Sequence, residues 1–371
     1  MKKITIFFYS VFLLLFSIFS YAFVDPNLSY LKNFFSDFAF SNRLLTTIFY
    51  TSAILIFFIF YGIFIHLGIK KKIHFKDVLM LLNITAIILF FSYPAMLSYD
   101  IFNYIATSKV LFLYHENPYI VMPIEFMGDP LLAFTHAANK IALYGPFWIF
   151  LAGIPYLLGF GGFIIVLFSF KLLNLLFYFG IVFLIWKISK NISFLILFAL
   201  NPLVVIDTIV SGHNDVVMIF FALLSFFMLM KKKIFFALLL FVLSILIKYT
   251  TILLIPIFIY LLWKIIKKEE INWKNIFYFS CILMYIGFLL SPIREEIYPW
   301  YAIWFIPFAF LVPDKKILLY VSIAFSFSLL FRYIPYMLTG TYSGQTPVMK
   351  EIISFTSPVL VSVYYVLKKK I

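Results

Sequence analysis

The sequence predicts an all-α polytopic membrane protein, a bundle of about 12 transmembrane helices, since one helix crosses the bilayer in about 20 residues. Of the 371 residues, 65% are hydrophobic and only 12% are charged, and the mean hydropathy is +1.08. Soluble domains are about half apolar and a quarter charged. Such an excess of apolar surface excludes a soluble enzyme, a disordered protein and a coiled coil. The single cysteine, Cys281, excludes a disulfide framework and a cysteine-based metal or redox site.

The basic residues predict the direction of the chain. The net charge is +14, but the lysines form short clusters between apolar runs, which argues against a nucleic-acid partner. Short loops rich in Lys and Arg stay in the cytoplasm. With all clusters inside, both termini are cytoplasmic and the protein is a multi-pass component of the plasma membrane. The predicted spans are 4–24, 44–68, 77–97, 162–186, 192–207, 215–230, 234–247, 249–263, 273–291, 299–312, 316–333 and 351–367.

The sequence leads to three further expectations about the segments outside or at the ends of these spans. Residues 98–146 form a long outer loop, half apolar and interrupted by prolines, in which we expect interfacial helices and the catalytic residues. Residues 147–159 are too short for a span and contain Gly153 and Pro155, which favours an interfacial or re-entrant helix. The first apolar run permits cleavage near Ala22. The whole chain, 1–371, is interpreted as a single integral membrane domain.

Asp100 is the first candidate catalytic residue. It directly follows the third span, so it can be a solvated helix-end residue or a general base held at the membrane surface. Aromatic side chains near it could form the walls of a site. These are Tyr99, Tyr104, Tyr119 and Tyr144.

A second polar cluster, Ser211 to Asp215, lies between two apolar runs at the predicted outer side. His213, Asn214 and Asp215 could hydrogen-bond a sugar or phosphate, or Asn214 or Asp215 could cap the next helix. A divalent metal is possible but not expected, because no second His follows at the spacing of metal ligands.

Isolated cations on the predicted outer side are Lys248, Arg294 and Arg332. Each could bind phosphate or extend to lipid headgroups. Lys171 lies within a predicted span and needs a partner that the sequence does not identify. Tyr298 and Trp300 could form an aromatic belt at the interface or a platform on which a sugar ring stacks.

Five segments in this order resemble the polyprenol-phosphate-mannose-dependent mannosyltransferases of the GT-C class, especially the bacterial α-1,6-mannosyltransferase type. They are SYDIFNYIATSKVLFLYHENPY, YGPFWIFLAGIP, NPLVVIDTIVSGHNDVVMIFF, LSILIKYTTILLIP and YPWYAIWFIPFAF, within residues 95–312. Two features depart from the family. The acid pair of its first loop is reduced to Asp100, and its Arg before the Asn-Pro-Tyr turn corresponds to Lys109.

The resemblance implies that the helices form a GT-C-like bundle. It also implies a membrane glycosyltransferase that moves a hexose, expected to be mannose, from a polyprenyl-phosphate donor to an extracytoplasmic glycan or glycolipid, with inversion. Asp100 would be the single base, because polyprenyl phosphate leaves without a general acid. Lys248, Arg294, Arg332 and Lys109 would bind the donor phosphate. The sugars would be positioned by Tyr99, Tyr119, Tyr144, His213, Asn214, Asp215, Tyr298 and Trp300. No cofactor is expected.

Two other functions remain open from the sequence. A transporter or flippase of lipid-linked sugar would place polar residues near the bilayer midplane, as Asn83, Lys171 and Asn174 could be. A glycan polymerase or ligase would use a similar lipid-phosphate substrate outside the cell. The sugar, the acceptor, the linkage and the oligomeric state are not specified by the sequence.

Overall fold

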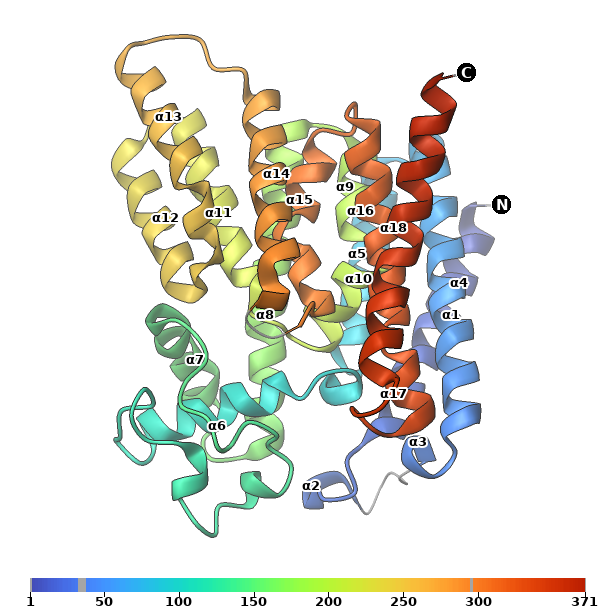
Figure 1. Cartoon of the computed structure of the whole chain (residues 1–371), viewed down its shortest axis with the longest axis vertical. Helices are drawn as coiled ribbons and strands as arrows, with labels where there is room; N and C mark the ends of the chain where they lie inside the picture. Colours follow the sequence, from blue (N-terminus) through green and yellow to red (C-terminus); the bar gives the residue numbers. More distant parts are fainter. Residues whose placement is uncertain (1, 33–37, 294–295, 371) are drawn as a thin grey trace.

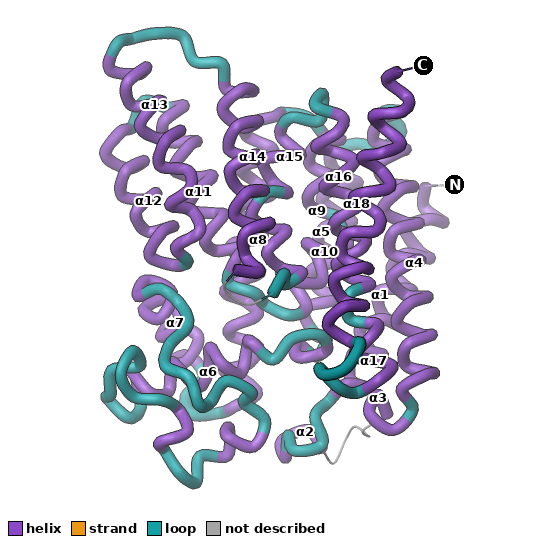
Figure 2. The backbone as a smooth tube through the Cα atoms, viewed as in Figure 1, coloured by secondary structure: helices purple, strands orange, loops and turns teal. Residues whose placement is uncertain are grey.

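The computed structural model describes residues 2–32, 38–293 and 296–370, and all regular elements in these residues are helices (Figure 1). The long helices lie side by side in the upper part of the molecule, while loops and short helices gather at the lower end (Figure 2). Both ends of the chain lie toward the upper end. The prediction of an all-α protein is confirmed for the described residues.

The first half of the chain runs to the 27-residue helix α8. Its helices are α1 (Lys2–Ser20), α2 (Ser29–Lys32), α3 (Phe38–Ser41), α4 (Arg43–Ile69), α5 (Phe75–Phe90), α6 (Asp100–Phe112), α7 (Pro146–Leu158) and α8 (Phe163–Ser189). Single 3₁₀ turns join them at η1 (Tyr21–Phe23), η2 (Pro94–Met96), η3 (Pro123–Glu125) and η4 (Pro130–Ala133).

The second half contains shorter helices. They are α9 (Ile192–Ala199), α10 (Pro202–Val205), α11 (Asp215–Met230), α12 (Ile234–Ile247), α13 (Ile255–Ile266), α14 (Trp273–Leu290), α15 (Ile306–Leu311), α16 (Lys316–Phe331), α17 (Ile334–Thr339) and α18 (Thr346–Lys370). A π-helical turn, η5 (Ile206–Val210), follows α10. The 3₁₀ segments are η6 (Tyr249–Leu254), η7 (Ser291–Ile293) and η8 (Pro299–Trp304).

Six helical stretches of the described chain are long and apolar enough to cross a membrane, judged by length and composition. They are Lys2–Phe23, Arg43–Ile69, Phe163–Ser189, Tyr249–Ile266, Trp273–Ile293 and Lys316–Thr339. A pair bent by 55°, Ile192–Ala199 with Pro202–Val210, would make a seventh span. Shorter apolar helices are Pro146–Leu158, Asp215–Met230, Ile234–Ile247 and Pro299–Leu311. These helices support a membrane-spanning protein, but the predicted twelve crossings are not confirmed.

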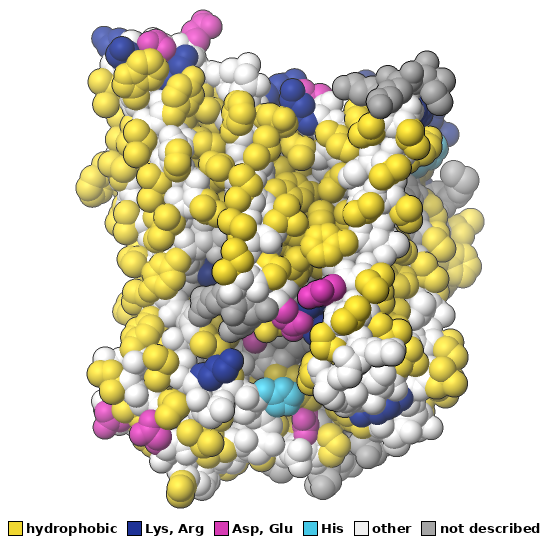
Figure 3. Space-filling model, in the orientation of Figure 1, with side chains coloured by type: hydrophobic (Ala, Val, Ile, Leu, Met, Phe, Trp, Pro, Cys, Tyr) yellow, Lys and Arg dark blue, Asp and Glu magenta, His cyan; other side chains and the backbone are white. Residues whose placement is uncertain are grey.

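The surface has the distribution of a membrane protein. Hydrophobic side chains cover the upper, helical part of the face in Figure 3, and Lys and Arg are prominent along its upper rim. Exposed side chains such as Phe7, Ile59 and Phe235 are more than half accessible, which is unfavourable in water but not in lipid. Charged side chains also meet in a hollow below the hydrophobic surface, where the site described below is located.

The N-terminal helix α1 packs along α5. Lys2 forms an ion pair with Asp77, and the Tyr9 hydroxyl lies 3.0 Å from the Thr85 hydroxyl. Leu13 and Phe16, farther along α1, are buried. The segment for which the sequence also permits cleavage is thus an integral helix of the bundle described here.

Lys171, fully buried in α8, caps the end of α5. Its ammonium donates hydrogen bonds to the carbonyl oxygens of Leu89 (3.3 Å) and Ser92 (2.5 Å). It also lies 5.7 Å from the centre of the Phe168 ring. The last carbonyls of a helix have no partners within the helix and carry partial negative charge, which a cation satisfies. The partners of Lys171, which the sequence did not identify, are therefore backbone carbonyl groups.

The turn 211–215 lies well inside the bundle. The Asn174 side chain in α8 donates a 2.8 Å hydrogen bond to the Gly212 carbonyl. Asn174 lies about 16 Å along α8 from Phe163, at about 1.5 Å per residue. The turn directly precedes α11, which begins at Asp215. The turn is thus recessed from the Phe163 end of α8.

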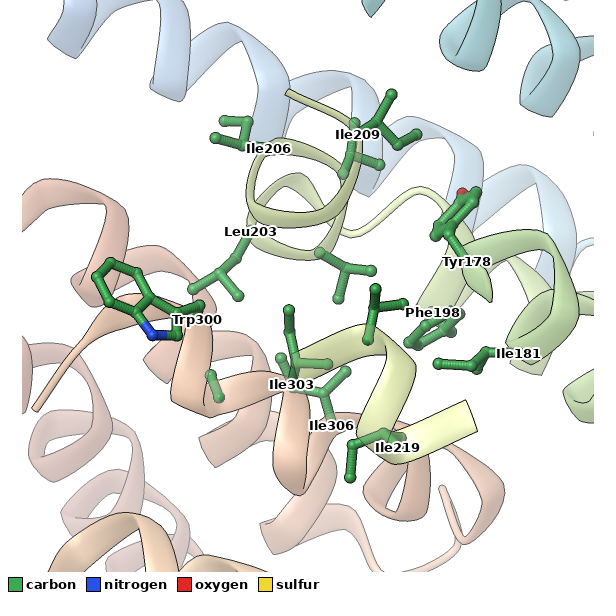
Figure 4. Packing of buried hydrophobic residues seen from close by; sticks show 14 of the residues in the cluster. Tyr178, Ile181, Phe198, Leu203, Ile206, Ile209, Ile219, Trp300, Ile303 and Ile306 are labelled. Carbon is green, nitrogen blue, oxygen red and sulfur yellow. The ribbon is translucent and has the colours of Figure 1, made fainter. Parts of the chain in front are cut away.

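A buried apolar core fixes this turn against the segment that carries Trp300 (Figure 4). Leu203 and Ile206 precede the turn, while Ile303 and Ile306 follow Trp300, and all four are 0% exposed. Inside a membrane bundle, close van der Waals packing of such side chains holds the helices together. The core therefore positions two polar segments that lie far apart in the sequence.

Candidate active site

Asp100 is the first residue of α6. The predicted span 77–97 is wrong at its end, because α5 stops at Phe90 and the 3₁₀ turn at Pro94 redirects the chain. The Asp100 N–H donates to the Ser98 hydroxyl at 3.3 Å, and the Asp100 side chain is 26% exposed. A carboxylate in the first turn of a helix is favoured by the helix dipole. Asp100 is therefore both held in place and accessible.

The turn 211–215 brings His213 to Asp100. Gly212 has φ +70, a conformation that side chains disfavour, and the His213 N–H donates to the Asp207 carbonyl at 3.0 Å. His213 Nδ1 then lies 3.6 Å from Asp100 Oδ2. Neither imidazole nitrogen has a hydrogen-bond partner among the described residues. The buried ring can thus reach Asp100 through a small movement.

An aromatic stack continues from His213 toward the surface. The His213 and Trp300 rings have centroids 3.9 Å apart and planes inclined by 17°. Tyr298 covers the other face of Trp300 at 4.6 Å and 8°. Pro299, between these two residues, begins the 3₁₀ segment η8. The stack forms an aromatic wall beside Asp100.

Lys248, at the C-terminal end of α12, forms an ion pair with Asp215. Its ammonium lies 2.8 Å from Asp215 Oδ1 and 4.5 Å from the centre of the Tyr301 ring. The Trp304 indole N–H donates to the same carboxylate oxygen. Asp215 is 0% exposed, whereas the Lys248 side chain is 20% exposed. The buried acid therefore fixes a cation whose charge reaches the cavity.

Two cavities meet at Asp100, and we call them cavity A and cavity B. Both are lined by Asp100, Asn103, His136, Tyr298 and Trp300. Cavity A, about 210 Å³, adds Glu296, Arg332, Tyr333, Tyr336, Tyr342 and Lys350 among others. Cavity B, about 560 Å³, adds Lys140, Tyr144, Lys248, Leu253, Gly287 and Leu290 among others. Asp100 thus lines both of these adjoining cavities.

The predicted tyrosines occupy different positions around these cavities. Tyr99 lines cavity A, where its ring stacks on His136 at 3.9 Å and its hydroxyl donates to Asp25 at 2.9 Å. Tyr144 lines cavity B. Tyr119 lines neither cavity, but its hydroxyl donates to the Tyr144 carbonyl at 2.8 Å. Tyr119 therefore supports the wall rather than forming it.

The predicted cluster of His213, Asn214 and Asp215 lies behind the cavity walls. All three are 0% exposed and line neither cavity. Asn214 accepts a 3.3 Å hydrogen bond from the Tyr104 hydroxyl. As the structure stands, these residues would act on a sugar only through the side chains that they position, Asp100, Trp300 and Lys248.

The three described members of the four predicted phosphate-binding cations are not brought together. Lys248 lines cavity B and Arg332 lines cavity A, on either side of Asp100. Lys109 lines neither cavity and forms a 2.7 Å ion pair with Asp129. Burial raises the pKa of Asp129, but hydrogen bonds from Lys109, the Leu131 N–H and Tyr114 outweigh it and hold the pKa below its usual value. Arg294 lies outside the described residues.

The part of the chain that the structure describes contains no preformed metal site. No three His, Cys, Asp or Glu side chains converge there. Asp100 and His213 alone would give two ligands, fewer than a catalytic zinc site supplies. The expectation of metal-independent chemistry stays a prediction.

Sequence reasoning missed several cavity residues. Asn103 could have been found, because it lies three residues after Asp100 and therefore on the same helix face. His136 and Lys140 follow no recognisable pattern in the 98–146 segment. Partial burial lowers the pKa of His136, and nearby Asp25 opposes this effect. Lys350 lies beyond the segments that carry the family resemblance, so only the tertiary fold reveals it.

Comparisons with known proteins place the chain in a family. No curated protein matches it, and no solved structure matches it. A family model described as "Alpha-(1->6)-mannopyranosyltransferase, N-terminal domain" matches residues 7–264. This range contains Asp100, the turn 211–215 and Lys248, and it excludes Trp300 and Arg332. Because the match covers more than half of the chain, the protein belongs to the MptA_B family of α-(1→6)-mannopyranosyltransferases and is a glycosyltransferase.

Proposed function

We propose that the protein transfers mannose from a polyprenyl-phosphate donor to an extracytoplasmic glycan or glycolipid acceptor in the plasma membrane, with inversion at C1. The family supports mannosyl transfer. The observation that carries the proposal is the position of Asp100, whose carboxylate lines two cavities at once. A direct displacement needs this arrangement, with one reactant on each side and a base at the junction.

The chemical step requires one base. The acceptor hydroxyl attacks C1 of the sugar, its proton passes to Asp100, and the bond from C1 to the phosphate oxygen breaks. Polyprenyl phosphate takes the bonding electrons and leaves as a stabilised anion, so no general acid is needed. Glycoside hydrolysis differs, because its poorer leaving group requires a second carboxyl group. The single acid at the cavity junction fits this chemistry.

Cavity B suits the donor. It combines two cations, Lys140 and Lys248, with apolar side chains such as Leu253 and Leu290. Leu290 is 51% exposed on the lipid-type surface of α14. A phosphate could therefore lie near the cations while the isoprenoid extends along the apolar side. Cavity A, with its tyrosines and charged groups, would receive the acceptor.

Anomeric preference tests the direct displacement. The family name specifies an α product, so inversion requires a β-linked mannosyl phosphate. We expect membranes that contain the protein to transfer label from β-linked polyprenyl-phosphate mannose, in EDTA as well as without it, and to give a product that an α-mannosidase releases. Membranes without the protein are the control. Use of the α-linked donor would contradict inversion, and loss of transfer in EDTA would contradict metal independence.

Topology provides a second test. The Lys-rich turn 231–233 and the site lie at opposite ends of α11 and α12, which supports an extracytoplasmic site by the distribution of positive charge. Asn117 is exposed in the 98–146 segment. We expect a cysteine introduced in place of Asn117 to react with a membrane-impermeant maleimide in intact cells, and a cysteine in place of exposed Lys232 to react only after lysis. The reverse pattern would place the site in the cytosol.

The transporter hypothesis loses part of its support. Lys171 caps α5, and Asn174 binds the Gly212 carbonyl. Two of the three polar residues that favoured a midplane binding site therefore have structural partners. A transporter would move labelled lipid across vesicles without forming product, and this outcome of the donor assay would displace the proposal.

A further inference from the structure

Three charged side chains form one wall of cavity A. Arg332 follows the last residue of α16, Lys350 lies near the start of α18, and Glu296 precedes η8. Arg332 donates to Glu296, and the Lys350 ammonium lies 2.8 and 3.0 Å from its two carboxylate oxygens. Arg332 also donates to the Ser354 hydroxyl at 3.1 Å. Two helix-borne cations therefore share one acid.

Among the described residues, the two cations of this wall share a single carboxylate, so their charges are not balanced. Side-chain exposure is 4% for Arg332, 12% for Lys350 and 36% for Glu296. Removing two cations from water for one carboxylate is unfavourable unless a further anion compensates them. The carboxylate is the most exposed of the three and belongs to an irregular segment. Glu296 is therefore the member that another anion could most easily displace.

Cavity A connects this wall to the proposed base. Asp100, Trp300, Tyr336 and Tyr342 line the same space. A sugar that presents its hydroxyl to Asp100 and its ring to Trp300 could extend toward Arg332. Cavity B already holds Lys140 and Lys248 for a donor phosphate, so a second cationic wall is left for the other substrate.

We propose that the acceptor carries an anionic group, a phosphate or a carboxylate, which binds Arg332 and Lys350 and displaces Glu296. This inference rests on the proposed function, because it takes cavity A as the acceptor site. A hydrogen bond to a charged group contributes about 1.5–3 kcal/mol, or about 10–100-fold in an equilibrium constant. The protein should therefore prefer an anionic acceptor by about that factor.

Matched acceptors test the preference. Transfer would be measured to a short mannoside with a neutral aglycone and to the same mannoside carrying a phosphate or a carboxylate. We expect kcat/KM to favour the anionic compounds about 10–100-fold, and Lys350→Gln to reduce that ratio about tenfold. Glu296→Gln should increase the ratio by removing the competing carboxylate. Lys274→Gln, whose side chain is 74% exposed, is the control and should leave the ratio unchanged.

Binding without donor separates this inference from the proposed function. The purified protein would be titrated with the same mannosides while tryptophan fluorescence is recorded, since Trp300 lines the cavity. Stronger binding of the anionic compounds, lost in Lys350→Gln, would support the site even if no donor were used. The inference would be overturned if the protein bound the neutral and the anionic mannosides equally well. It would also be overturned if Lys350→Gln weakened the binding of both mannosides to the same extent, and Glu296 would then be only a structural bridge between the two cations. Preferential binding without transfer would overturn only the proposed function.

Discussion

Replacing Asp100 by asparagine should reduce mannosyl transfer by about 10²–10⁴-fold, the usual contribution of a positioned base. Asparagine keeps the size of the side chain and can still lie near His213, but it cannot accept the hydroxyl proton. The side chain is only partly buried, so the fold should persist. The measurement is label transfer from polyprenyl-phosphate mannose, with protein quantity determined in the same membranes.

A neighbouring acid provides the control for this variant. Glu116 is exposed in the same 98–146 segment and lines neither cavity. Glu116→Gln should therefore transfer at the rate of the unmodified protein. Undiminished transfer by Asp100→Asn at normal abundance would remove Asp100 from catalysis, and the reaction would need another base.

The Lys248→Met substitution should have two separate effects. Transfer should fall about 10²–10³-fold, the loss seen when one group that stabilises developing charge is removed. The folded state should also lose about 3 kcal/mol, because Asp215 would remain fully buried without its cation. Transfer assays and thermal unfolding in detergent would measure the two effects, with exposed Lys274→Met as the control.

A double substitution distinguishes these two roles. When Asp215→Asn is combined with Lys248→Met, no buried charge is left unpaired, and the amide oxygen of the introduced asparagine can still accept a hydrogen bond from the Trp304 indole. Stability should therefore largely return while transfer stays low. If transfer returned together with stability, Lys248 would act only through the fold and not on the donor phosphate.

Hydropathy predicted the all-α class because the period and length of apolar runs are local properties. Span ends were less predictable. The third predicted span ran to residue 97, but the helix ends at Phe90 and Pro94 starts a 3₁₀ turn. Proline disfavours the helical conformation of the residue before it, so Pro94 was a local signal that the helix ends. The apolar composition of residues 91–97 outweighed this signal in the prediction.

The site was predictable where polar residues interrupt apolar runs. Asp100 and Lys248 were chosen for this reason, whereas Trp300 was chosen from an aromatic segment. The structure places all three on cavity walls. The ion pairs that the charged side chains form could not be predicted in the same way. Lys109 meets Asp129 rather than a cavity, because the path of the chain between them depends on tertiary packing. Lys350 and Glu296 meet only through such packing.

The recessed turn 211–215 has a consequence for the efficiency of the reaction. If the Phe163 end of α8 marks the outer edge of the bilayer, bond breaking takes place beneath the headgroups, where bulk water is scarce. An activated sugar there has few small nucleophiles to react with before a carbohydrate arrives. Wasteful hydrolysis of the isoprenoid intermediate would then be limited by depth alone, without a moving lid.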